Sequence, residues 1–372
     1  MNLSTNDRST SEWPDAGHLD FTPAVRARTA GLFDRVRDVV PEAEWPLHAP
    51  LIDAIRRLAA ERNAVILAHN YMTPEIFHGV GHATGDSLKL AQLAAESDAE
   101  VIVQAGVHFM AETAKILCPD KTVLIPDLRA GCSLAASITG ADVERIKQAY
   151  PGVPVVTYVN TTAEVKAASD ICCTSSNAVQ VVEAVAAQWN SDTVILIPDE
   201  YLAKNVASQT DIRILTWQGA CEVHERFTAA EIEQLRAEHP DAMIITHPEC
   251  PPDVLKAADF AGSTGAMAAF VRDRKPAKAI LITECSMSDN VAVDNPETRF
   301  VRPCNLCPHM KRITLESIYD ALRFNRYEVE VDPAVAEAAR ASVQAMLDLP
   351  ALDGPPAFDT ARPAVSIPYV QV

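Results

Sequence analysis

The sequence is short of basic residues and has no long apolar run. Lys and Arg number 32 against 50 Asp and Glu, so the formal net charge is -18 with His neutral. Such an acidic surface repels polyanions, which argues against nucleic acid as a partner. No stretch approaches the roughly 18 apolar residues that cross a bilayer, and residues 1–20 are polar and mixed in charge, unlike a secretory signal. We therefore expect a cytoplasmic protein that binds neither nucleic acid nor membrane.

The chain has nine cysteines, an odd number that does not suit a framework of disulfides. In a reducing compartment thiols stay free, so cysteines serve as metal ligands, redox groups or small buried hydrophobic residues. We predict buried apolar thiols at five positions: Cys118, Cys172, Cys173, Cys250 and Cys285.

Between two Pro-containing ends, short β-branched runs alternate with Ala-rich stretches of helical periodicity. This alternation is typical of parallel sheets covered by helices, and it predicts the α/β class. Hydrophobic residues make up 48% of the 372 positions, enough for two or three domain-sized cores. The ends, about 1–50 and 350–372, read as tails or loosely packed arms.

A pattern of polar residues repeats three times along the chain. The first set stands at the ends of predicted strands, spaced by 89 residues twice: His69, Tyr158 and His247. The second set lies in loops ahead of predicted helices, spaced by 88 and 89 residues: Ser87, Ser175 and Thr264. The third set closes each unit with a cysteine, spaced by 89 and 86 residues: Cys132, Cys221 and Cys307. Three sets with one period indicate three copies of one small α/β unit.

The period predicts three homologous three-layer αβα domains around a pseudo-threefold axis. Their expected bounds are 51–142, 143–231 and 232–311, with an N-terminal extension at 1–50 and C-terminal helices with a Pro-rich tail at 312–372. Ligands of parallel sheets collect at the carboxyl ends of the strands, where all three polar sets fall. We therefore expect one active site at the central junction.

Three cysteines from three units would offer three thiolates to one metal centre. A four-iron cubane takes four ligands, so three thiolates leave one iron open to polarise a substrate oxygen. Zinc is the competing metal, but its structural sites favour paired spacings, and only Cys304 with Cys307 has one here. The period favours a [4Fe-4S] cluster on Cys132, Cys221 and Cys307.

Eight segments in this order resemble the quinolinate synthase family, whose members condense iminoaspartate with dihydroxyacetone phosphate in nicotinamide cofactor synthesis. The segments are LAHNYM (67–72), GDSLKLAQ (85–92), YVNTTAEVKAASD (158–170), PDEYLAKNVA (198–207), WQGACEVHE (217–225), HPEC (247–250), STGAM (263–267) and CNLCPHM (304–310). The resemblance implies a three-domain α/β fold and a [4Fe-4S] cluster on the cysteines that the period selects. The products would be quinolinate, phosphate and water.

The resemblance also implies a set of substrate-binding residues for iminoaspartate. These are His69, Ser87, Tyr158, Val159, Asn160, Ser175, His247, Pro248, Glu249 and Thr264. Some relatives carry a further cysteine three residues before Cys304, where this chain has Val301, so a redox pair with that thiol is absent here. Cys304 and Cys307 remain free to pair. A functional link to an aspartate-oxidising enzyme and to iron–sulfur assembly machinery follows from the resemblance alone.

The chemistry so implied needs anion partners and several proton carriers. Hydroxyls at helix starts bind carboxylate or phosphate, although Ser87, Ser175 and Thr264 would also serve as plain N-caps. We assign Glu249 as general base, with Tyr71 and Tyr158 as its acid or base partners. The remaining proton carriers are His69 and His247. His224, three residues after Cys221, would contact the cluster or substrate, or be structural.

Three other interpretations stay open. A zinc-dependent aldolase or hydrolase would use Cys and His ligands with the same loops. A non-catalytic iron–sulfur sensor would need the cysteines but not three sets of polar strand-end residues. A three-repeat binding module for an anionic metabolite would leave the cysteine period unexplained. Metal and sulfide analysis separates the first of these from the iron–sulfur enzyme.

Overall fold

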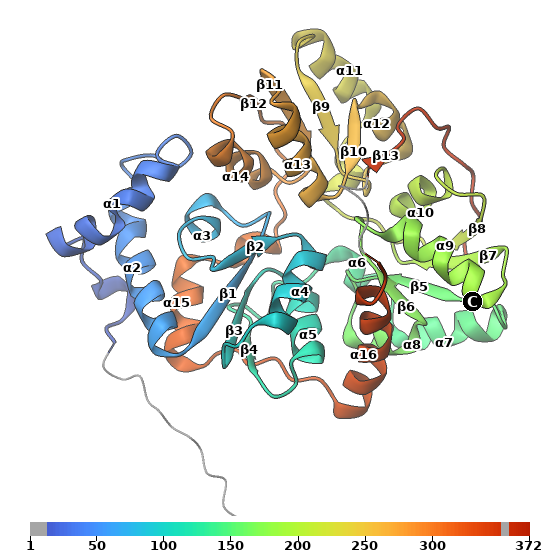
Figure 1. Ribbon diagram of the computed structural model, residues 1–372, viewed down its shortest axis with the longest axis horizontal. Helices are drawn as coiled ribbons and strands as arrows, with labels where there is room; N and C mark the ends of the chain where they lie inside the picture. Colours follow the sequence, from blue (N-terminus) through green and yellow to red (C-terminus); the bar gives the residue numbers. More distant parts are fainter. Residues whose placement is uncertain (1–12, 351–356) are drawn as a thin grey trace, which may run out of the picture.

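The computed structural model of the chain describes residues 13–350 and 357–372. Parallel sheets alternate with helices throughout, so the α/β prediction is confirmed. Figure 1 shows three lobes that meet near the middle of the molecule, coloured blue to cyan, green, and yellow to orange along the chain. Each lobe is built around one sheet.

The first sheet has the order β2-β1-β3-β4, with all neighbours parallel. Its strands are β1 (Ala64–His69), β2 (Ala83–Gly85), β3 (Val101–Ala105) and β4 (Thr122–Leu124). Its helices are α3 (Pro74–Phe77), α4 (Ser87–Glu96), α5 (His108–Leu117) and α6 (Ser133–Ala136). Every residue of β3 is buried, as expected of a strand that is covered on both faces.

The second sheet repeats this order as β6-β5-β7-β8. Its strands are β5 (Val155–Tyr158), β6 (Ile171–Cys173), β7 (Thr193–Ile197) and β8 (Arg213–Thr216). Its helices are α7 (Gly140–Ala149), α8 (Ala163–Ala168), α9 (Ala178–Trp189) and α10 (Glu200–Ala207), and the 3-10 turn η2 (His224–Arg226) follows β8.

The third sheet has the order β12-β11-β9-β10-β13, which is the same four-strand order with one antiparallel strand added at the edge. Its strands are β9 (Met243–Thr246), β10 (Phe260–Gly262), β11 (Lys278–Ile282), β12 (Arg299–Val301) and β13 (Ala357–Phe358). Its helices are α11 (Ala229–Glu238), α12 (Pro252–Ala257), α13 (Thr264–Arg274) and α14 (Ser286–Asp294), followed by η3 (Met310–Arg312).

Most described residues of the two predicted arms, 13–44 and 357–372, are exposed, but segments next to them pack firmly against the fold. After the 3-10 turn η1 (Ala16–His18), α1 (Pro23–Val36) packs on α2 (Trp45–Glu61), and α2 packs on the first sheet. α2 buries ten residues and packs against β1 and α15 (Leu315–Phe324). The amphipathic spacing of its apolar residues, with Ile52, Ile55 and Leu58 fully buried, explains why it docks.

The C-terminal part is tied to all three lobes. α16 (Pro333–Leu347) packs against α8, β6 and α5, between the first and second lobes (Figure 1). β13 then pairs with β10, and the Val370 amide donates to the Thr216 carbonyl at 2.7 Å. The predicted tail therefore fastens the lobes together, although residues 351–356 of it lie outside the described part.

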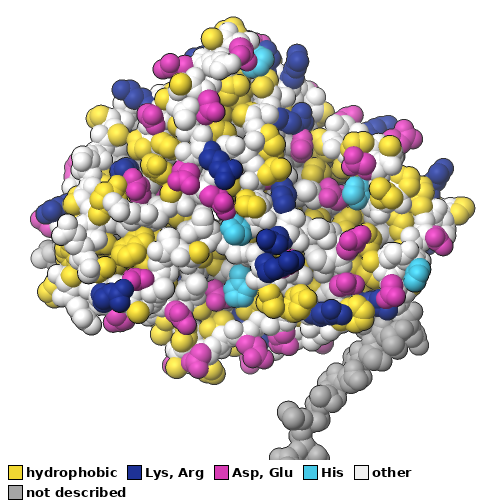
Figure 2. All heavy atoms as spheres, turned by 180° about the vertical axis from the view of Figure 1, so that it is seen from behind, with side chains coloured by type: hydrophobic (Ala, Val, Ile, Leu, Met, Phe, Trp, Pro, Cys, Tyr) yellow, Lys and Arg dark blue, Asp and Glu magenta, His cyan; other side chains and the backbone are white. Residues whose placement is uncertain are grey.

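None of the predicted unit bounds falls between elements. The bounds at 50/51, 142/143 and 231/232 lie inside α2, α7 and α11, and 311/312 lies inside η3. None of the helices among the described residues is long and apolar enough to cross a membrane. On the face shown in Figure 2, acidic side chains are scattered, and several Lys, Arg and His side chains lie together near the centre.

Candidate active site

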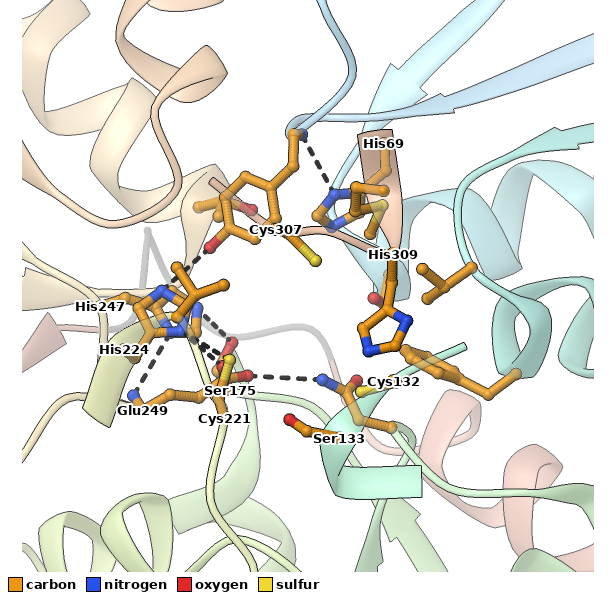
Figure 3. A pocket seen from close by; sticks show the side chains of 18 of the residues that line it. His69, Cys132, Ser133, Ser175, Cys221, His224, His247, Glu249, Cys307 and His309 are labelled. Atoms are coloured by element: carbon orange, nitrogen blue, oxygen red, sulfur yellow. Dashed lines mark hydrogen bonds and ion pairs between the residues drawn. The ribbon is translucent and has the colours of Figure 1, made fainter. Parts of the chain in front are cut away.

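One cavity at the junction of the lobes collects the residues that the repeat predicts. Thirteen of the predicted residues line it: His69, Tyr71, Ser87, Cys132, Tyr158, Asn160, Ser175, Cys221, His224, His247, Glu249, Thr264 and Cys307. Figure 3 shows side chains from all three lobes turned toward the same space. The equal strand order explains this convergence, because the carboxyl ends of parallel strands share one edge of each sheet.

Two predicted substrate contacts, Val159 and Pro248, do not line this cavity. The side chain of Val159 lies in a neighbouring hollow with Leu90, and its amide donates to the Cys173 carbonyl at 2.9 Å. Pro248 has no N–H, and its carbonyl accepts from Asn205 Nδ2 at 2.8 Å. Neither residue lines the cavity, and a direct contact of either with the substrate stays a prediction.

The strand-end residues are deeply buried and locally braced. His69 ends β1 and Tyr158 ends β5, while His247 follows β9, and the three expose 4 to 6% of their surface. His69 Nδ1 accepts from the Tyr71 amide at 3.2 Å, and His247 Nδ1 accepts from the Glu249 amide at 3.3 Å. Because the amide occupies Nδ1 in both turns, the ring orientation is fixed and Nε2 is the ring nitrogen that remains for other partners.

Burial also fixes the charge of these two rings. Desolvation lowers the pKa of His69 to about 4 and that of His247 to about 3, against an ordinary value near 6.5. The nearby Glu249 carboxylate opposes this shift but does not overcome it. Both imidazoles are therefore neutral at pH 7.

Glu249 is the hub of the hydrogen bonds in the cavity. Its Oε1 accepts from the Tyr158 hydroxyl at 2.5 Å and from Asn160 Nδ2 at 3.4 Å, and its Oε2 lies 2.8 Å from His224 Nδ1. Burial alone would raise the pKa of Glu249, but His247, His224 and the hydrogen bond from Tyr158 outweigh it, so the pKa lies below its ordinary value. Because His247 is neutral at pH 7, the hydrogen bonds carry this stabilisation at that pH.

A second branch of the network leads from Glu249 to Tyr71. With Glu249 ionised, His224 Nδ1 carries the proton, so His224 Nε2 accepts from the Thr283 hydroxyl at 2.9 Å. The Tyr71 hydroxyl lies 2.6 Å from Thr283 Oγ1. A continuous chain of hydrogen bonds thus joins Tyr71, through Thr283 and His224, to Glu249 and Tyr158.

Both tyrosines hold their protons firmly in this state. Burial, followed by the charge of Glu249, raises the pKa of Tyr71 and of Tyr158 well above the ordinary phenol value. Each is therefore a hydrogen-bond donor at neutral pH.

The three hydroxyl residues stand at helix starts but are not the caps. Ser87 and Thr264 are the first residues of α4 and α13, whereas the N-caps are Asp86 and Ser263. Ser175 precedes α9 by three residues. Their hydroxyls are thus not consumed in capping, which leaves them for the cavity near free helix N–H groups.

Two of these hydroxyls contact their neighbours in the cavity wall. Thr264 Oγ1 accepts from Asn70 Nδ2 at 2.9 Å, and Ser175 Oγ lies 3.4 Å from His247 Nε2. The Asn160 Oδ1 atom is buried and makes no hydrogen bond to the described residues. A buried acceptor without a partner costs free energy, so it is suited to receive a donor from a ligand.

Asp86 joins the first lobe to the third at this point. Its Oδ1 accepts from the Lys89 amide at 3.0 Å, and a Cβ placed on Gly265 would lie 2.8 Å from its Oδ2. Gly265 therefore allows the carboxylate of α4 to approach the start of α13. The two helix N-termini are held side by side.

Three free thiols face the cavity from different lobes. Cys132, Cys221 and Cys307 are each partly exposed and unpaired (Figure 3). Burial raises the pKa of all three thiols, and that of Cys132 to about 12. The neighbouring thiols add to this effect, because Cys307 raises the pKa of Cys132 and Cys132 raises the pKa of Cys221. Thiols close enough to perturb one another, with no disulfide, are a donor set that suits a cluster, which would bind them as thiolates.

The three cysteine loops share a downstream anchor. Seven residues after each cysteine comes the threonine that begins a capping box: Thr139, Thr228 and Thr314. Each accepts from the amide three residues on, and that residue's side chain returns a hydrogen bond. The same device therefore fixes the exit of each loop in all three units.

Neighbours of the cysteines also tie the loops to one another. Ser133 Oγ donates to the Ala220 carbonyl at 3.0 Å and accepts from the Glu222 amide at 3.1 Å. His309 Nε2 lies 2.9 Å from Glu222 Oε1. A Cβ on Gly131 would lie 3.6 Å from His309 Nδ1, at an ordinary van der Waals distance. The first loop is thus joined to the second, and the second to the third.

A buried ion pair lies behind the third loop. Lys311 Nζ contacts Glu284 Oε1 at 2.8 Å, the Tyr71 carbonyl at 2.8 Å and Ser286 Oγ at 2.7 Å. Glu284 is fully buried, and its Oε1 also accepts from the Cys307 amide at 3.4 Å. This pair links the backbone of Tyr71 to the backbone of Cys307.

The prediction for the other cysteines is confirmed at four positions and wrong at one. Cys118, Cys172, Cys173 and Cys250 are buried free thiols. Cys285 instead forms a disulfide with Cys304, with Cα atoms 5.0 Å apart. The neighbouring residues Glu284 and Asn305 form a parallel bridge that brings the two loops together. A pair between Cys304 and Cys307 is therefore not formed.

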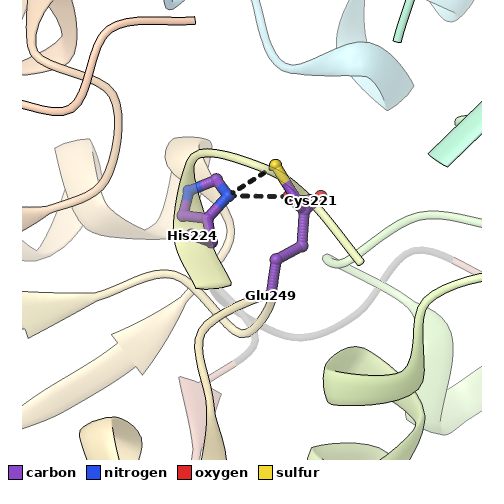
Figure 4. Close-up of side chains that lie close together, drawn as sticks. All are labelled: Cys221, His224 and Glu249. Carbon is purple, nitrogen blue, oxygen red and sulfur yellow. Dashed lines mark hydrogen bonds and ion pairs between the residues drawn. The ribbon is translucent and has the colours of Figure 1, made fainter. Parts of the chain in front are cut away.

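One compact group in the cavity unites two kinds of donor. The ligand atoms of Cys221, His224 and Glu249 all lie within 4.8 Å of one another, and His224 Nδ1 is 3.1 Å from Cys221 Sγ (Figure 4). His224 exposes only 1% of its surface. His224 thus contacts both a predicted cluster ligand and the predicted base, and its role as a cluster or substrate contact stays a prediction.

Several residues of the site were not expected from the sequence. Besides Thr283, the lining includes Asp86, Phe109, Gly131, Ser133, Thr174, Ser176, Glu222, Val223, His309 and Met310. Many of them adjoin a predicted residue, so neighbourhood was an available signal. Thr283 follows β11 at the carboxyl end of a central strand, which was a signal of the same kind.

The sequence is similar to a known family over most of its length. The model of the family described as quinolinate synthetase A protein matches residues 53–348. A protein of Caulobacter vibrioides named quinolinate synthase is 62% identical over 342 residues, covering 92% of this chain and 93% of its own. Quinolinate synthase 1 of Mesorhizobium japonicum is 63% identical over 324 residues, with coverage of 87% and 99%. This chain belongs to the quinolinate synthetase A protein family.

Proposed function

We propose that the protein is a quinolinate synthase that condenses iminoaspartate with dihydroxyacetone phosphate to give quinolinate, phosphate and water. One observation carries the proposal: three free thiols and the strand-end residues of three sheets line a single cavity in a chain of this family. The substrates are anions, and the reaction needs proton transfers and loss of water. The cavity has groups for each task.

The thiols of Cys132, Cys221 and Cys307 would hold a [4Fe-4S] cluster. Three free thiols on one cavity, anchored by matching capping boxes, fit such a group. When bound, a cluster with three protein ligands supplies an open iron that acts as a Lewis acid for the loss of a substrate hydroxyl. The protein side chains provide binding and proton transfer.

Glu249 is the proposed general base. A carboxylate whose pKa is lowered is a weak base alone, so its proton uptake must be coupled to proton release elsewhere. The two hydrogen-bonded branches offer this coupling, one to Tyr158 directly and one through His224 and Thr283 to Tyr71. Tyr158 and Tyr71 are therefore the proposed acid partners.

The neutral rings of His69 and His247 and the hydroxyl groups bind the substrate in this proposal. Ser87, Ser175 and Thr264 would donate to the carboxylates, supported by the N-termini of α4, α9 and α13. Asn160 Oδ1, which lacks a partner among the described residues, would accept from the imine or enamine N–H. Neutral histidines can donate without adding charge to the site.

The same strand order in three sheets supports a pseudo-threefold arrangement of three related units. We place their borders in the cysteine loops, a few residues before 143 and 232, because α7 and α11 begin at Gly140 and Ala229. The N-terminal extension then ends before α2, and the C-terminal segment begins with α15. Each unit contributes one residue of each polar set.

The proposed setting is the cytoplasm. Iminoaspartate is unstable in water, so an aspartate-oxidising enzyme must supply it close in time, and iron–sulfur assembly machinery must supply the cluster. An excess of 18 acidic charges argues against nucleic acid.

A zinc-dependent aldolase or hydrolase is the second candidate. It is favoured by the group of Cys221, His224 and Glu249, whose thiolate, imidazole and carboxylate suit a zinc ion. The sensor and the plain binding module remain weaker, because neither needs the hydrogen-bonded chain between two tyrosines.

The test is an assay of protein purified without oxygen, with iron, sulfide and zinc measured on the same sample. We expect quinolinate only when both substrates and the iron–sulfur cluster are present. Ser87→Ala should raise KM for iminoaspartate about tenfold, whereas Ser97→Ala at the other end of α4 should leave it unchanged. Activity that follows zinc content instead of iron would contradict the proposal and favour the second candidate.

A further inference from the structure

We propose that the cluster-free protein binds one zinc ion through the Cys221 thiolate, the His224 imidazole and the Glu249 carboxylate, and that this zinc excludes the iron–sulfur cluster. The exclusion of the cluster rests on the proposed function, whereas the zinc site itself is argued from geometry alone. The zinc here blocks the site and takes no part in the reaction.

The three ligand atoms are already close to a metal-binding arrangement. His224 Nδ1 lies 3.1 Å from Cys221 Sγ and 2.8 Å from Glu249 Oε2, and all three atoms fall within 4.8 Å (Figure 4). In a tetrahedral zinc site with bonds of 2.0 to 2.3 Å, donor atoms stand roughly 3.3 to 3.8 Å apart. Shifts of about 1 Å or less in these three separations would therefore give the spacing that the ion requires.

The backbone presets this group. Cys221 and His224 lie on one turn, in which the Glu225 amide donates to the Cys221 carbonyl at 3.0 Å. Glu249 lies in the loop after β9, and the Glu249 amide donates to His247 Nδ1. Zinc would thus join the second lobe to the third without moving either strand.

His224 and Glu249 each have a partner that holds the side chain in place, as metal ligands usually do. Zinc takes the lone pair of His224 Nδ1, so the ring proton moves to Nε2, where Thr283 Oγ1 at 2.9 Å accepts it. The other oxygen of Glu249 keeps its hydrogen bond from the Tyr158 hydroxyl at 2.5 Å.

Charge favours the ion as well. A thiolate and a carboxylate neutralise Zn²⁺, so the buried group becomes neutral, and the Cys221 proton leaves to solvent. Thiolate with imidazole selects zinc over magnesium or calcium, which prefer oxygen ligands. The fourth position is open to water, as in zinc sites with three protein ligands.

Zinc and the cluster would share one ligand and differ in the others. Cys221 belongs to both donor sets and one thiolate cannot serve both, so the two metals compete. His224 and Glu249 are needed for zinc only, whereas Cys132 and Cys307 are needed for the cluster only. Single substitutions therefore distinguish the two sites.

The experiment titrates full-length, cluster-free protein with Zn²⁺ against a colorimetric chelator, and with Co²⁺ as a spectroscopic probe. We expect one equivalent of zinc, and a thiolate-to-cobalt charge-transfer band that is lost in Cys221→Ser. His224→Gln and Glu249→Gln should each weaken zinc binding at least about tenfold. Cys132→Ser and Cys307→Ser are the matched controls and should bind zinc as the unmodified protein does.

A second measurement tests exclusion. Zinc-loaded protein should fail to assemble a cluster from iron and sulfide until a chelator is added, whereas His224→Gln should assemble it in the presence of equimolar zinc. Circular dichroism verifies that His224→Gln is folded, and Glu249→Gln replaces it if it is not. Zinc binding that is lost in Cys132→Ser, or unchanged in both His224→Gln and Glu249→Gln, would overturn the inference.

The outcomes also separate this inference from the proposed function. Stoichiometric zinc on Cys221 in a protein that never assembles a cluster would preserve the zinc site and refute the iron–sulfur enzyme. A cluster that assembles equally well with and without zinc would refute the exclusion and leave the proposed function intact.

Discussion

The two walls of the cavity are built in different ways. The strand-end wall, formed by His69, Tyr158, His247 and Glu249, is at least 94% buried and is braced by sheet backbone. The cysteine wall, formed by the loops that carry Cys132, Cys221 and Cys307, is partly exposed and depends on side chains that join one loop to the next.

In the proposed function, the strand-end wall carries out proton transfer and the cysteine wall binds the metal centre. Groups that exchange protons must keep fixed distances, which strand ends provide. The proposed cluster would be received by loops, which side-chain contacts of Ser133, Glu222 and His309 hold together. His224 lies where the two walls meet, since it contacts both Cys221 and Glu249.

The largest effect should come from Glu249→Gln on the strand-end wall. The amide keeps the size of the side chain but cannot accept the substrate proton, so kcat should fall about 100- to 10,000-fold. Iron and sulfide content should stay normal, because Glu249 is not a cluster ligand in the proposal. The measurement is steady-state quinolinate formation normalised to iron, and a loss below tenfold would contradict the assignment of the base.

Buried histidine on the same wall should make stability depend on pH. The pKa of His69 is about 4 in the folded protein and near 6.5 when unfolded, so the unfolded state binds a proton first as pH falls. The contribution of His69 to the free energy of unfolding is therefore present above pH 6.5 and is lost as the pH falls below it. Between pH 7 and 5, the free energy of unfolding should fall by about 2 kcal/mol more in the unmodified protein than in His69→Asn.

Urea unfolding at the two pH values measures this difference, and His18→Asn, which changes an exposed histidine, is the control. Asn can replace the Nδ1 acceptor that receives the Tyr71 amide, so the fold should be kept. Equal pH dependence in His69→Asn and the unmodified protein would show that the ring is not held neutral by burial.

Thr283→Val should interrupt the branch that leads to Tyr71. Val has the same shape but no hydroxyl, so the hydrogen bonds to His224 Nε2 and the Tyr71 hydroxyl are both lost. We expect kcat to fall about 10- to 30-fold with KM nearly unchanged, because two hydrogen bonds of roughly 1 kcal/mol each are lost from a buried chain. Thr29→Val, at a buried threonine on α1, is the matched control, and equal rates for the two variants would remove the branch from the mechanism.

The smallest effect should come from the cysteine wall, where Glu222→Gln removes the ion pair with His309. The pair is partly exposed, so its contribution is about 0.5 to 1 kcal/mol, and the rate of cluster loss to an iron chelator should rise roughly two- to sixfold. Lys278→Gln, which removes a surface ion pair with Asp241, should leave that rate unchanged. No acceleration in Glu222→Gln would mean that the loops are held by other contacts.

Period and strand chemistry were sufficient to predict the class and the cavity. A strand such as 64–69 is apolar at nearly every position, which only a sheet covered on both faces explains. The spacing of His69, Tyr158 and His247 then placed three strand ends at one junction. These signals are local or periodic, so a single sequence contains them.

Other features depend on contacts that no local pattern carries. The Cys285 to Cys304 disulfide joins the loops after β11 and β12, and only the pairing of those strands makes the two residues neighbours. Val159 was expected in the cavity because the resemblance gave a continuous run, but its amide is used in sheet pairing and its side chain lies in the next hollow. The packing of α2 needed the position of α15, which is far along the chain.

The most direct test of the account is the iron and sulfide content of Cys132→Ser, Cys221→Ser and Cys307→Ser, each purified without oxygen beside Cys118→Ser. Cys118 is a buried thiol outside the cavity whose hydrogen bond to the Ala94 carbonyl a serine can keep. We predict about four irons and four sulfides per chain in the unmodified protein and in Cys118→Ser, and loss of both with activity in each of the other three. A full cluster in any one of those three would contradict the convergence of three units on one metal centre.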